Sequence, residues 1–377
     1  MPFTSIDDRY CKELPHQPAL NGLSYKCLIP NVIKVKIGVL TGGGDCPGLN
    51  NAIRAVTRSA IERDWTVIGI RNGWAGVLAQ ETSTLTIENT DRFFDVGGTL
   101  LGSSRTNPTR TREDYAKATS IFGDIGLDGL IAIGGDDTLS VAGALAGDGF
   151  PIVGVPKTID NDVPETDACI GYDTAAETIS ISIERLRTTS MSHHRITVVE
   201  TMGRQAGWLA AAGGIAGGSD FIAVPEVKTS LDDFVQHVRS RYEAGQSYSI
   251  IVVAEGATID GLNLESAEVQ EGDEFGHVIL STRSVGETLA RTLENETGYE
   301  ARASVLGHLQ RGGSPTTFDR VLGTRLGLAA VDFLDGKTHG QMTALHGSLV
   351  EPVPLTLIAG KTRALDPSYF ELLRLFK

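Results

Sequence analysis

The sequence has few cysteines, no long apolar run and no excess of basic residues. Its four cysteines, Cys11, Cys27, Cys46 and Cys169, are far apart and form no C-x-x-C pair, which excludes a zinc knuckle and a thioredoxin-like redox site. No run of about 18 apolar residues suggests a membrane-spanning helix. Residues 1–33 lack the apolar core of a secretory signal and are expected to form an N-terminal extension. These absences predict a cytoplasmic protein with reduced thiols.

The net charge of the chain indicates which kinds of binding partner are unfavourable. The formal net charge is −14, which argues against nucleic acid or an anionic membrane as the main partner. An anionic substrate would need a local basic pocket within this acidic protein. The 377 residues, 41% of them hydrophobic, are enough for about two to three domains with a large core.

Short apolar runs rich in β-branched residues alternate with helical stretches. Strands are predicted at 35–40, 65–70, 130–133, 152–155, 195–200, 249–254 and 304–307, and helices at 47–62, 112–122, 138–146, 174–188, 205–216, 285–296 and 321–334. This alternation is typical of parallel sheets covered by helices. Right-handed crossovers bring the loops after the strands to the carboxyl edge of a sheet, where ligands bind.

Two acidic segments follow two neighbouring predicted strands. The first runs from Gly134 to Thr138 (GGDDT), and the second from Pro156 to Asp162 (PKTIDND). Between them they supply carboxylates for magnesium or for proton removal, threonine hydroxyls, and Lys157 to offset charge on a transferred phosphoryl group. Either segment alone is as typical of an ordinary turn. Together, each after a strand, they predict phosphoryl transfer.

Other strand-end segments could bind anions. Gly42, Gly43 and Gly44 join a strand to a helix, an arrangement in which backbone N–H groups hold phosphate. This segment matches neither the GxGxxG nor the Walker A pattern. Arg105 follows a Gly-Ser turn and could clamp phosphate, although a solvated arginine would look the same.

The second half of the chain carries a similar set of candidates. They are Arg195 and Arg204 for an anionic sugar, Glu255 for sugar hydroxyls, and the pair His308 and Arg311 on a Gly-rich turn for a phosphate. Taken alone, each of these segments is equally compatible with a solvated turn. His193 and His194 point to opposite sides if they lie on a strand, so a helix end is favoured for them over a metal site.

Taken together, these segments resemble the phosphofructokinases. The matching stretches are LTGGGDCPGLN, GGTLLGSSR, IAIGGDDTL, PKTIDND, IGYDTA, SHHRITVVETMGRQAGWLA, VPE, VVAEG and ARASVLGHLQRGGSP, in the order of the family, from about Lys34 to about Arg325. The resemblance implies two doubly wound, mostly parallel α/β lobes with the active site in the cleft between them. It implies a donor-phosphate lobe of residues 34–172 plus about 310–335, and a sugar-phosphate lobe of residues 173–309 plus the C-terminal tail.

The resemblance also implies roles for single residues. Asp160 would be the base and Asp136 the Mg²⁺ ligand, and Gly44 and Arg105 would contact the donor. The sugar phosphate would be bound by Thr158, Ile159, Asp160, Asp162, Met202, Gly203, Arg204, Glu255, His308 and Arg311. Arg195 and Arg302 match arginines that reach the site of a neighbouring subunit, which implies a homodimer or homotetramer.

Two residues address the phosphate donor. ATP-using members usually have glycine where this chain has Asp137 and Lys157, so GGDD with PKTIDND resembles the pyrophosphate-dependent branch. Asp137 would occupy and repel the place of a nucleotide α-phosphate, and Lys157 would stabilise the transferred or leaving phosphate. The predicted reaction is reversible phosphoryl transfer from pyrophosphate to the 1-hydroxyl of fructose 6-phosphate, in glycolysis and gluconeogenesis.

Three alternatives stay open from the sequence. The first is the ATP-dependent reaction on the same sugar, and the second is a catalytically silent regulatory subunit, against which Asp136, Asp160 and Arg204 argue. The third is a dinucleotide-dependent dehydrogenase, which lacks support because no GxGxxG with a downstream acidic residue is present.

Overall fold

The larger of the two main sheets carries the triple-glycine turn and both acidic segments. A computed structural model of the chain describes residues 34–264 and 284–376. The sheet has seven strands in the order β13-β12-β5-β4-β1-β2-β3, and only β3 and β13 are antiparallel to their neighbours. The strands are β1 (Lys36–Thr41), β2 (Thr66–Ile70), β3 (Thr82–Leu85), β4 (Gly129–Gly134), β5 (Ile152–Pro156), β12 (Gln341–His346) and β13 (Leu349–Pro354).

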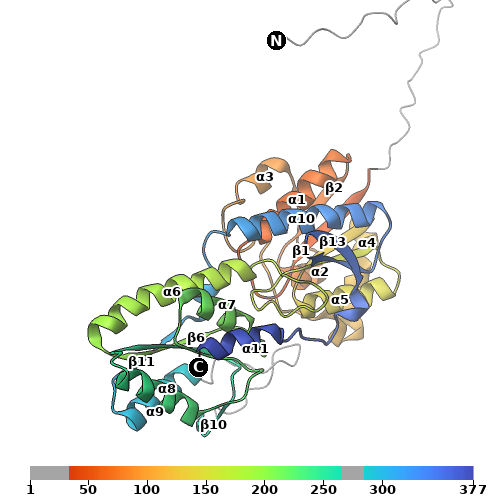
Figure 1. The fold of residues 1–377 in the computed structure, drawn as a ribbon. Coiled ribbons are helices and arrows are strands. Elements are labelled where there is room, and N and C mark those ends of the chain that lie inside the picture. Colours follow the sequence, from red (N-terminus) through yellow and green to blue (C-terminus); the bar gives the residue numbers. More distant parts are fainter. Residues whose placement is uncertain (1–33, 265–283, 377) are drawn as a thin grey trace, which may run out of the picture. The chain divides into compact units, whose positions relative to one another are not determined.

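Helices cover both faces of this sheet because its strands are apolar on both sides. In β4, Leu130 packs with the core cluster on one face, whereas Ile131 packs with the cluster on the other, as the two-residue period of a strand requires. α1 and α10 lie side by side on one face, and α2, α4 and α5 cover the other (Figure 1). The helices of this lobe are α1 (Leu49–Glu62), α2 (Gly73–Ala79), α3 (Ile87–Asp91), α4 (Arg112–Ile125), α5 (Asp136–Gly147) and α10 (Thr317–Asp335), with a 3-10 turn η1 (Pro108–Arg110).

The second sheet has four parallel strands in the order β11-β6-β9-β7. They are β6 (Ile196–Thr201), β7 (Phe221–Ala223), β9 (Ser249–Ala254) and β11 (Ala301–Val305). α6 (Tyr172–His193) and α7 (Trp208–Gly217) cover one face, and α8 (Leu231–Glu243) and α9 (Val285–Thr297) cover the other (Figure 1). The remaining elements are β8 (Thr229–Ser230), which pairs with β10 (Ile259–Asp260), η3 (Gly307–Arg311), η4 (Leu355–Leu357), α11 (Ser368–Leu373) and η5 (Arg374–Phe376).

The two lobes are tied together by a buried carboxylate. Asp319 of α10 accepts hydrogen bonds from the backbone N–H groups of Gly171 (2.8 Å) and Thr174 (2.9 Å), which are unpaired donors at the start of α6. Burial is the main cause that raises the pKa of Asp319 to about 6. This contact fixes the long helix α6, which leads into the second sheet, to the first lobe.

The α/β fold with two mostly parallel sheets is as predicted, and the element boundaries differ at defined points. Residues 341–354 belong to the tail that was assigned by resemblance to the sugar lobe, but β12 pairs with β5 in the larger sheet. The predicted helix 205–216 begins only at Trp208, because residues 203–206 form a turn with a left-handed Arg204 (φ 51°). His193 and His194 end α6, as expected.

Candidate active site

The loop after β1 brings backbone close to its neighbours. Gly43 has a φ of 76°, and its N–H donates to the carbonyl of Ser104 (2.9 Å). A Cβ at Gly42 would lie 2.4 Å from Thr138 Oγ1, and one at Gly44 would lie 2.3 Å from Arg311 Nη1. Only glycine fits the crowded position at Gly42, where the neighbour is a packed threonine. Gly42 is buried, whereas Gly43 and Gly44 are half-buried and keep part of the backbone of this turn accessible.

The second acidic segment begins with the buried Lys157. Lys157 follows β5, is 2% exposed, and donates from Nζ to the carbonyl of Gly44 (2.5 Å). Burial is the main cause that lowers the pKa of Lys157, and the nearby Arg311 lowers it further. Sequence reasoning placed Lys157 by the donor phosphates, and the structure places it at the triple-glycine turn.

Three residues later, the loop presents two buried carboxylates. Asp160 is 4% exposed, and its N–H donates to Thr158 Oγ1 (3.2 Å). Its Oδ1 atom is buried and has no hydrogen-bond partner among residues 34–264 and 284–376. Burial and then the charges of Asp160 and Asp136 raise the pKa of Asp162 to about 7. A carboxylate oxygen without a partner is available to accept a proton or a hydroxyl group.

Asp136 and Asp137 are the first two residues of α5. The positive end of the helix dipole favours negative charge at this position. Both carboxylates act on Arg204 and, together with Asp160 and Asp162, raise the pKa of its guanidinium, although burial alone would lower it. The two acidic segments that follow β4 and β5 therefore converge, as the parallel pairing of these strands requires.

The second lobe contributes a tight turn after β6. Gly203 (φ 141°) and the left-handed Arg204 donate their N–H groups to Glu255 Oε1, at 3.3 and 3.0 Å. Glu255 follows β9, the neighbour of β6, and burial is the main cause that raises its pKa. The preceding residue, Met202, donates its N–H to Gln310 Oε1 (3.3 Å).

An ion pair joins the two lobes at the candidate site. Arg204 Nε lies 4.0 Å from Asp160 Oδ2, and the side chain of Arg204 is 31% exposed. The guanidinium is thus held near the carboxylates of the first lobe while part of it faces solvent. This arrangement brings the predicted base and the predicted sugar-binding turn together.

The predicted phosphate pair, His308 and Arg311, lies on η3. His308 is exposed, whereas Arg311 donates from Nη1 to the carbonyl of Asp45 (3.2 Å) and lies against Gly44. The structure therefore directs the Arg311 guanidinium toward the triple-glycine turn. Sequence reasoning assigned Arg311 only to the far phosphate of the sugar.

Arg105 is exposed and directly follows Ser104, whose carbonyl accepts from the N–H of Gly43 in the triple-glycine turn. The other two predicted arginines lie away from the carboxylates of the site. Arg195 precedes β6 and lies 3.7 Å from Glu300, which also pairs with Arg302 on β11 (2.9 Å). Arg195 and Arg204 flank opposite ends of β6, about 20 Å apart at the rise of a strand. Arg195 therefore does not reach the carboxylates that Arg204 contacts.

The carboxylates of the site can be compared with the ligands that Mg²⁺ usually binds. Within the part of the chain that the structure describes, no three His, Cys, Asp or Glu side chains are arranged as a complete metal site. Mg²⁺ usually binds one or two carboxylates together with substrate phosphates and water. The unpartnered Oδ1 of Asp160 and the neighbouring Asp136 and Asp162 fit that kind of site.

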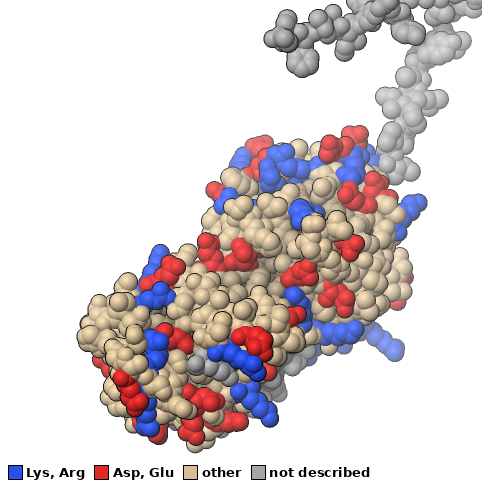
Figure 2. All heavy atoms as spheres, viewed as in Figure 1, with Lys and Arg blue, Asp and Glu red and all other residues tan. Residues whose placement is uncertain are grey.

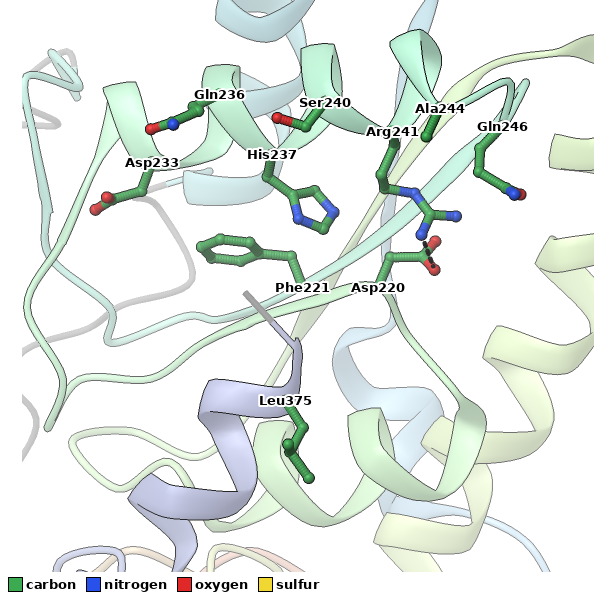
Figure 3. Close-up of a pocket in the computed structure, with 10 residues that line it drawn as sticks. All are labelled: Asp220, Phe221, Asp233, Gln236, His237, Ser240, Arg241, Ala244, Gln246 and Leu375. Carbon is green, nitrogen blue, oxygen red and sulfur yellow. Dashed lines mark ion pairs between the residues drawn. The ribbon is translucent and has the colours of Figure 1, made fainter.

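A separate pocket of about 540 Å³ lies beneath α8 in the second lobe (Figure 3). Arg241 and Asp220 form an ion pair in it at 3.0 Å, and His237 stacks edge-on against Phe221. None of the residues predicted from the sequence lines it. This pocket and the predicted chemistry are thus in different places.

Several residues of the site were missed by sequence reasoning. The buried Gln310 holds Met202 by accepting a hydrogen bond from its N–H. Asn161 has a φ of 53° between the two buried carboxylates, and Arg363 donates its N–H to the carbonyl of Asp162 (2.7 Å). Gln310 lies in the segment in which only its neighbours His308 and Arg311 were predicted to bind a ligand. No pattern in the sequence around Arg363 indicates a role for that residue.

Three features lie outside the site: the surface charge, the polarity of the helices and the state of the cysteines. On the face shown in Figure 2, basic side chains are scattered among acidic ones and form no continuous basic patch. Among the described helices, none is long and apolar enough to cross a membrane. Cys46 and Cys169 are buried free thiols, whereas Cys11 and Cys27 lie outside the described residues.

Comparison with known proteins supplies independent information. Residues 36–334 match the protein family described as phosphofructokinase. A pyrophosphate–fructose 6-phosphate 1-phosphotransferase of Dictyoglomus thermophilum is 47% identical over 343 residues, which are 91% of this chain and 99% of the relative. An ATP-dependent 6-phosphofructokinase of Streptomyces coelicolor is 42% identical and covers 85% of this chain and 94% of its own.

A solved structure agrees with the fold. The phosphofructokinase of Saccharomyces cerevisiae superposes with a TM-score of 0.72 at 30% identity. The match covers 86% of this chain and 45% of the yeast chain, so this chain spans less than half the length of that protein.

Proposed function

Because the chain belongs to the phosphofructokinase family, we propose that it transfers a phosphoryl group from pyrophosphate to the 1-hydroxyl of fructose 6-phosphate. The products are fructose 1,6-bisphosphate and phosphate, and the reaction is reversible. As a phosphotransferase of this kind, the protein would act in glycolysis and gluconeogenesis.

The observation that carries the choice of donor is the position of Lys157. Its ammonium lies buried at the triple-glycine turn, and Asp137 lies in the first turn of α5. A nucleotide would have to place its α-phosphate near Asp137, where two negative charges would repel each other. Pyrophosphate ends before that point, and Lys157 would offset the charge of the transferred or leaving phosphate.

Asp160 is proposed as the general base. Its free Oδ1 would accept the proton of the sugar 1-hydroxyl as that oxygen attacks the terminal phosphorus and the bond to the leaving phosphate breaks. Arg204 Nε lies 4.0 Å from the other oxygen of this carboxylate, Oδ2. Thr158, Ile159 and Asp162 would surround the same hydroxyl.

Asp136 would hold Mg²⁺, which would offset charge on the phosphates when bound. Gly44 would bind the donor through its backbone, and the exposed Arg105 would bind it through its guanidinium. On the acceptor side, Met202, Gly203, Arg204 and Glu255 would bind the sugar.

His308 and Arg311 would bind the sugar 6-phosphate. In the structure, Arg311 donates to the carbonyl of Asp45. It would have to exchange this bond for a phosphate oxygen, which is the stronger, charge-assisted partner.

The protein is further proposed to act in the cytoplasm as a homodimer or homotetramer. Arg195 lies at the end of β6 remote from Arg204, and Arg302 is half exposed on the edge strand β11. Both guanidinium groups would reach the sugar phosphate in a neighbouring copy. The donor lobe would comprise residues 34–172, about 310–335 and the strands β12 and β13, and the sugar lobe would comprise residues 173–309 and the end of the chain.

The donor decides between this proposal and the ATP-dependent reaction, which relatives with 42% identity carry in their names. Fructose 6-phosphate turnover should be measured with purified protein and either Mg-pyrophosphate or MgATP. We expect turnover with pyrophosphate and little with ATP, because Asp137 and Lys157 occupy the donor site. A clear preference for ATP would refute the assigned donor.

A further inference from the structure

A short stretch near the C-terminus touches both lobes beside the catalytic loop. The N–H of Arg363 donates to the carbonyl of Asp162 (2.7 Å), and its Nη1 donates to the carbonyl of Asp167 (2.8 Å). On the other side, Trp208 Nε1 donates to the carbonyl of Arg363 (3.1 Å), and the guanidinium lies 4.3 Å from the centre of the Trp208 ring. One residue therefore contacts the first lobe by two hydrogen bonds and the second lobe by a hydrogen bond and a cation–π contact.

The first-lobe contacts hold a strained part of the loop. Asn161 adopts a left-handed conformation (φ 53°) directly before Asp162. Its Oδ1 accepts from the N–H of Cys169 (2.9 Å), and its Nδ2 donates to the carbonyl of Asp167 (3.4 Å), which Arg363 also contacts. A strained backbone persists only where its surroundings fix it, and Arg363 is part of these surroundings.

The second-lobe contacts lie just beyond the sugar-binding turn. Glu226 Oε1 accepts from the N–H of Gly207 (3.0 Å) and from the N–H of Leu365 (2.8 Å). Gly207 and Trp208 follow the turn of Gly203 and Arg204 and begin α7. The same C-terminal stretch is therefore anchored at the start of α7 and at the catalytic loop.

We propose that Arg363 is a positioning residue that sets the distance between the catalytic loop of the first lobe and the sugar-binding turn of the second. It touches neither the base Asp160 nor the sugar-binding Arg204 in any described contact, but it fixes the residues beside each of them. The proposal rests on the proposed function, because it assigns the loop to the base and the turn to the acceptor.

The geometry explains why such a residue matters. The attacking oxygen and the base belong to groups held by different lobes, so a small change in the lobe arrangement moves one against the other. A misplacement of about 1 Å can cost about 100-fold in rate. An arginine suits the position because its planar group can stack on an indole and donate to a carbonyl at the same time.

Two conservative variants test the proposal. Arg363→Lys keeps the charge but loses the planar group, and Trp208→Phe keeps an aromatic ring but loses the N–H donor. We expect each to lower kcat/KM for fructose 6-phosphate by about tenfold, with a smaller effect on the KM for pyrophosphate. The double variant should fall by less than the product of the single effects, because both changes weaken the same cation–π contact.

Lys361→Ala is the matched control, since it removes a positive charge from an exposed side chain in the same stretch. We expect it to leave kcat/KM unchanged and to be additive with Trp208→Phe. If Arg363→Lys lowers Tm while kcat and both KM values stay at the wild-type level, Arg363 serves only stability and the proposal is wrong.

A second measurement does not depend on turnover. Hydrogen exchange should accelerate in the loop of residues 158–167 in Arg363→Lys, but not in Lys361→Ala. Unchanged exchange in this loop would overturn the proposal. If the wild-type protein does not use pyrophosphate and fructose 6-phosphate, the proposed function fails, while the exchange experiment still decides whether Arg363 holds the loop.

Discussion

Two clusters of charged side chains, one in each lobe, differ in how their charges are compensated. In the pocket beneath α8, Asp220 pairs with Arg241 at 3.0 Å and also accepts from the N–H of Ile250 (2.8 Å). Burial and the charge of Arg241 lower the pKa of His237 to about 4, so that the ring is neutral at physiological pH. Arg241 and Asp220 therefore balance each other in this pocket, while Asp233, the other carboxylate that lines it, accepts hydrogen bonds from Ser230 at the start of α8.

At the strand ends, the carboxylates outnumber the cations that face them. Arg204 interacts with Asp160, Asp136, Asp162 and Asp137, and Lys157 interacts with Asp160. Burial, followed by repulsion from Asp160 and Asp136, raises the pKa of Asp162 to about 7. Asp160 keeps one buried oxygen without a partner among the described residues. Repulsion of this kind costs stability and is expected where a ligand or metal completes the site. The comparison teaches that the proposed active site differs from the pocket beneath α8 by its crowded carboxylates.

The largest expected effect is on turnover in Asp160→Asn. The amide cannot accept the proton of the sugar hydroxyl, so we expect kcat to fall by about 10² to 10⁴. The same change removes one of several repelling carboxylates, so the free energy of unfolding should stay equal or rise. Steady-state kinetics and denaturant unfolding on the same preparation check both. Wild-type kcat in this variant would contradict the assigned base.

Asp220→Asn is the control in the other cluster, with the opposite pattern. It removes half of the ion pair with Arg241 and should cost about 1–3 kcal/mol of stability. Because Asp220 lies outside the proposed catalytic groups, kcat at a temperature where the protein is folded should match the wild type. A loss of turnover in this variant would erase the distinction between the two clusters.

A smaller effect is expected when the donor site is changed. In the double variant Asp137→Gly with Lys157→Gly, the repulsion of a nucleotide α-phosphate is removed together with the buried ammonium. The ratio of kcat/KM for ATP to that for pyrophosphate should rise by about tenfold or more, a difference of about 1.4 kcal/mol between the two donors. The single variant Asp137→Gly tests the repulsion of the nucleotide, and the single variant Lys157→Gly tests the loss of the buried ammonium. An unchanged ratio would sink the steric argument.

The fold was predictable where a short run of apolar residues in the sequence indicates a strand. β1, β4 and β5 follow from runs of β-branched residues, and the convergence of their loops follows from parallel pairing. α8 was not predicted, although its capping box of Ser230 and Asp233 is a local signal. The hairpin of β12 and β13 lies beyond the stretch that resembles the family, so nothing assigned it to the first sheet.

The site was predictable in its members but less so in its geometry. Asp160 and Arg204 were named from the sequence, whereas their approach to 4.0 Å depends on how two lobes pack. The direction of Arg311 toward Asp45 and the contacts of Arg363 with Asp162 join residues far apart in the chain. Spacing within a motif contains no information about such contacts.

The smallest effect is expected from His237→Gln in the pocket beneath α8. The pKa of His237 is about 4 in the folded protein and about 6.5 in an unfolded chain. Between these values the unfolded chain binds more protons, so this residue makes the folded state less stable as the pH falls from 6.5 toward 4.

Replacement by glutamine removes this dependence. Between about pH 7.5 and pH 5.5 the variant should lose about 1 kcal/mol less unfolding free energy than the wild type, after allowing for partial exposure. His346→Gln is the matched comparison with the opposite sign, because the hydrogen bond to Glu351 raises the pKa of that exposed histidine. Denaturant unfolding at the two pH values measures the slopes. If the unfolding free energy changes with pH to the same extent in His237→Gln and in the wild type, the pocket beneath α8 does not hold a neutral histidine. The contrast drawn between the two charged clusters would then be wrong.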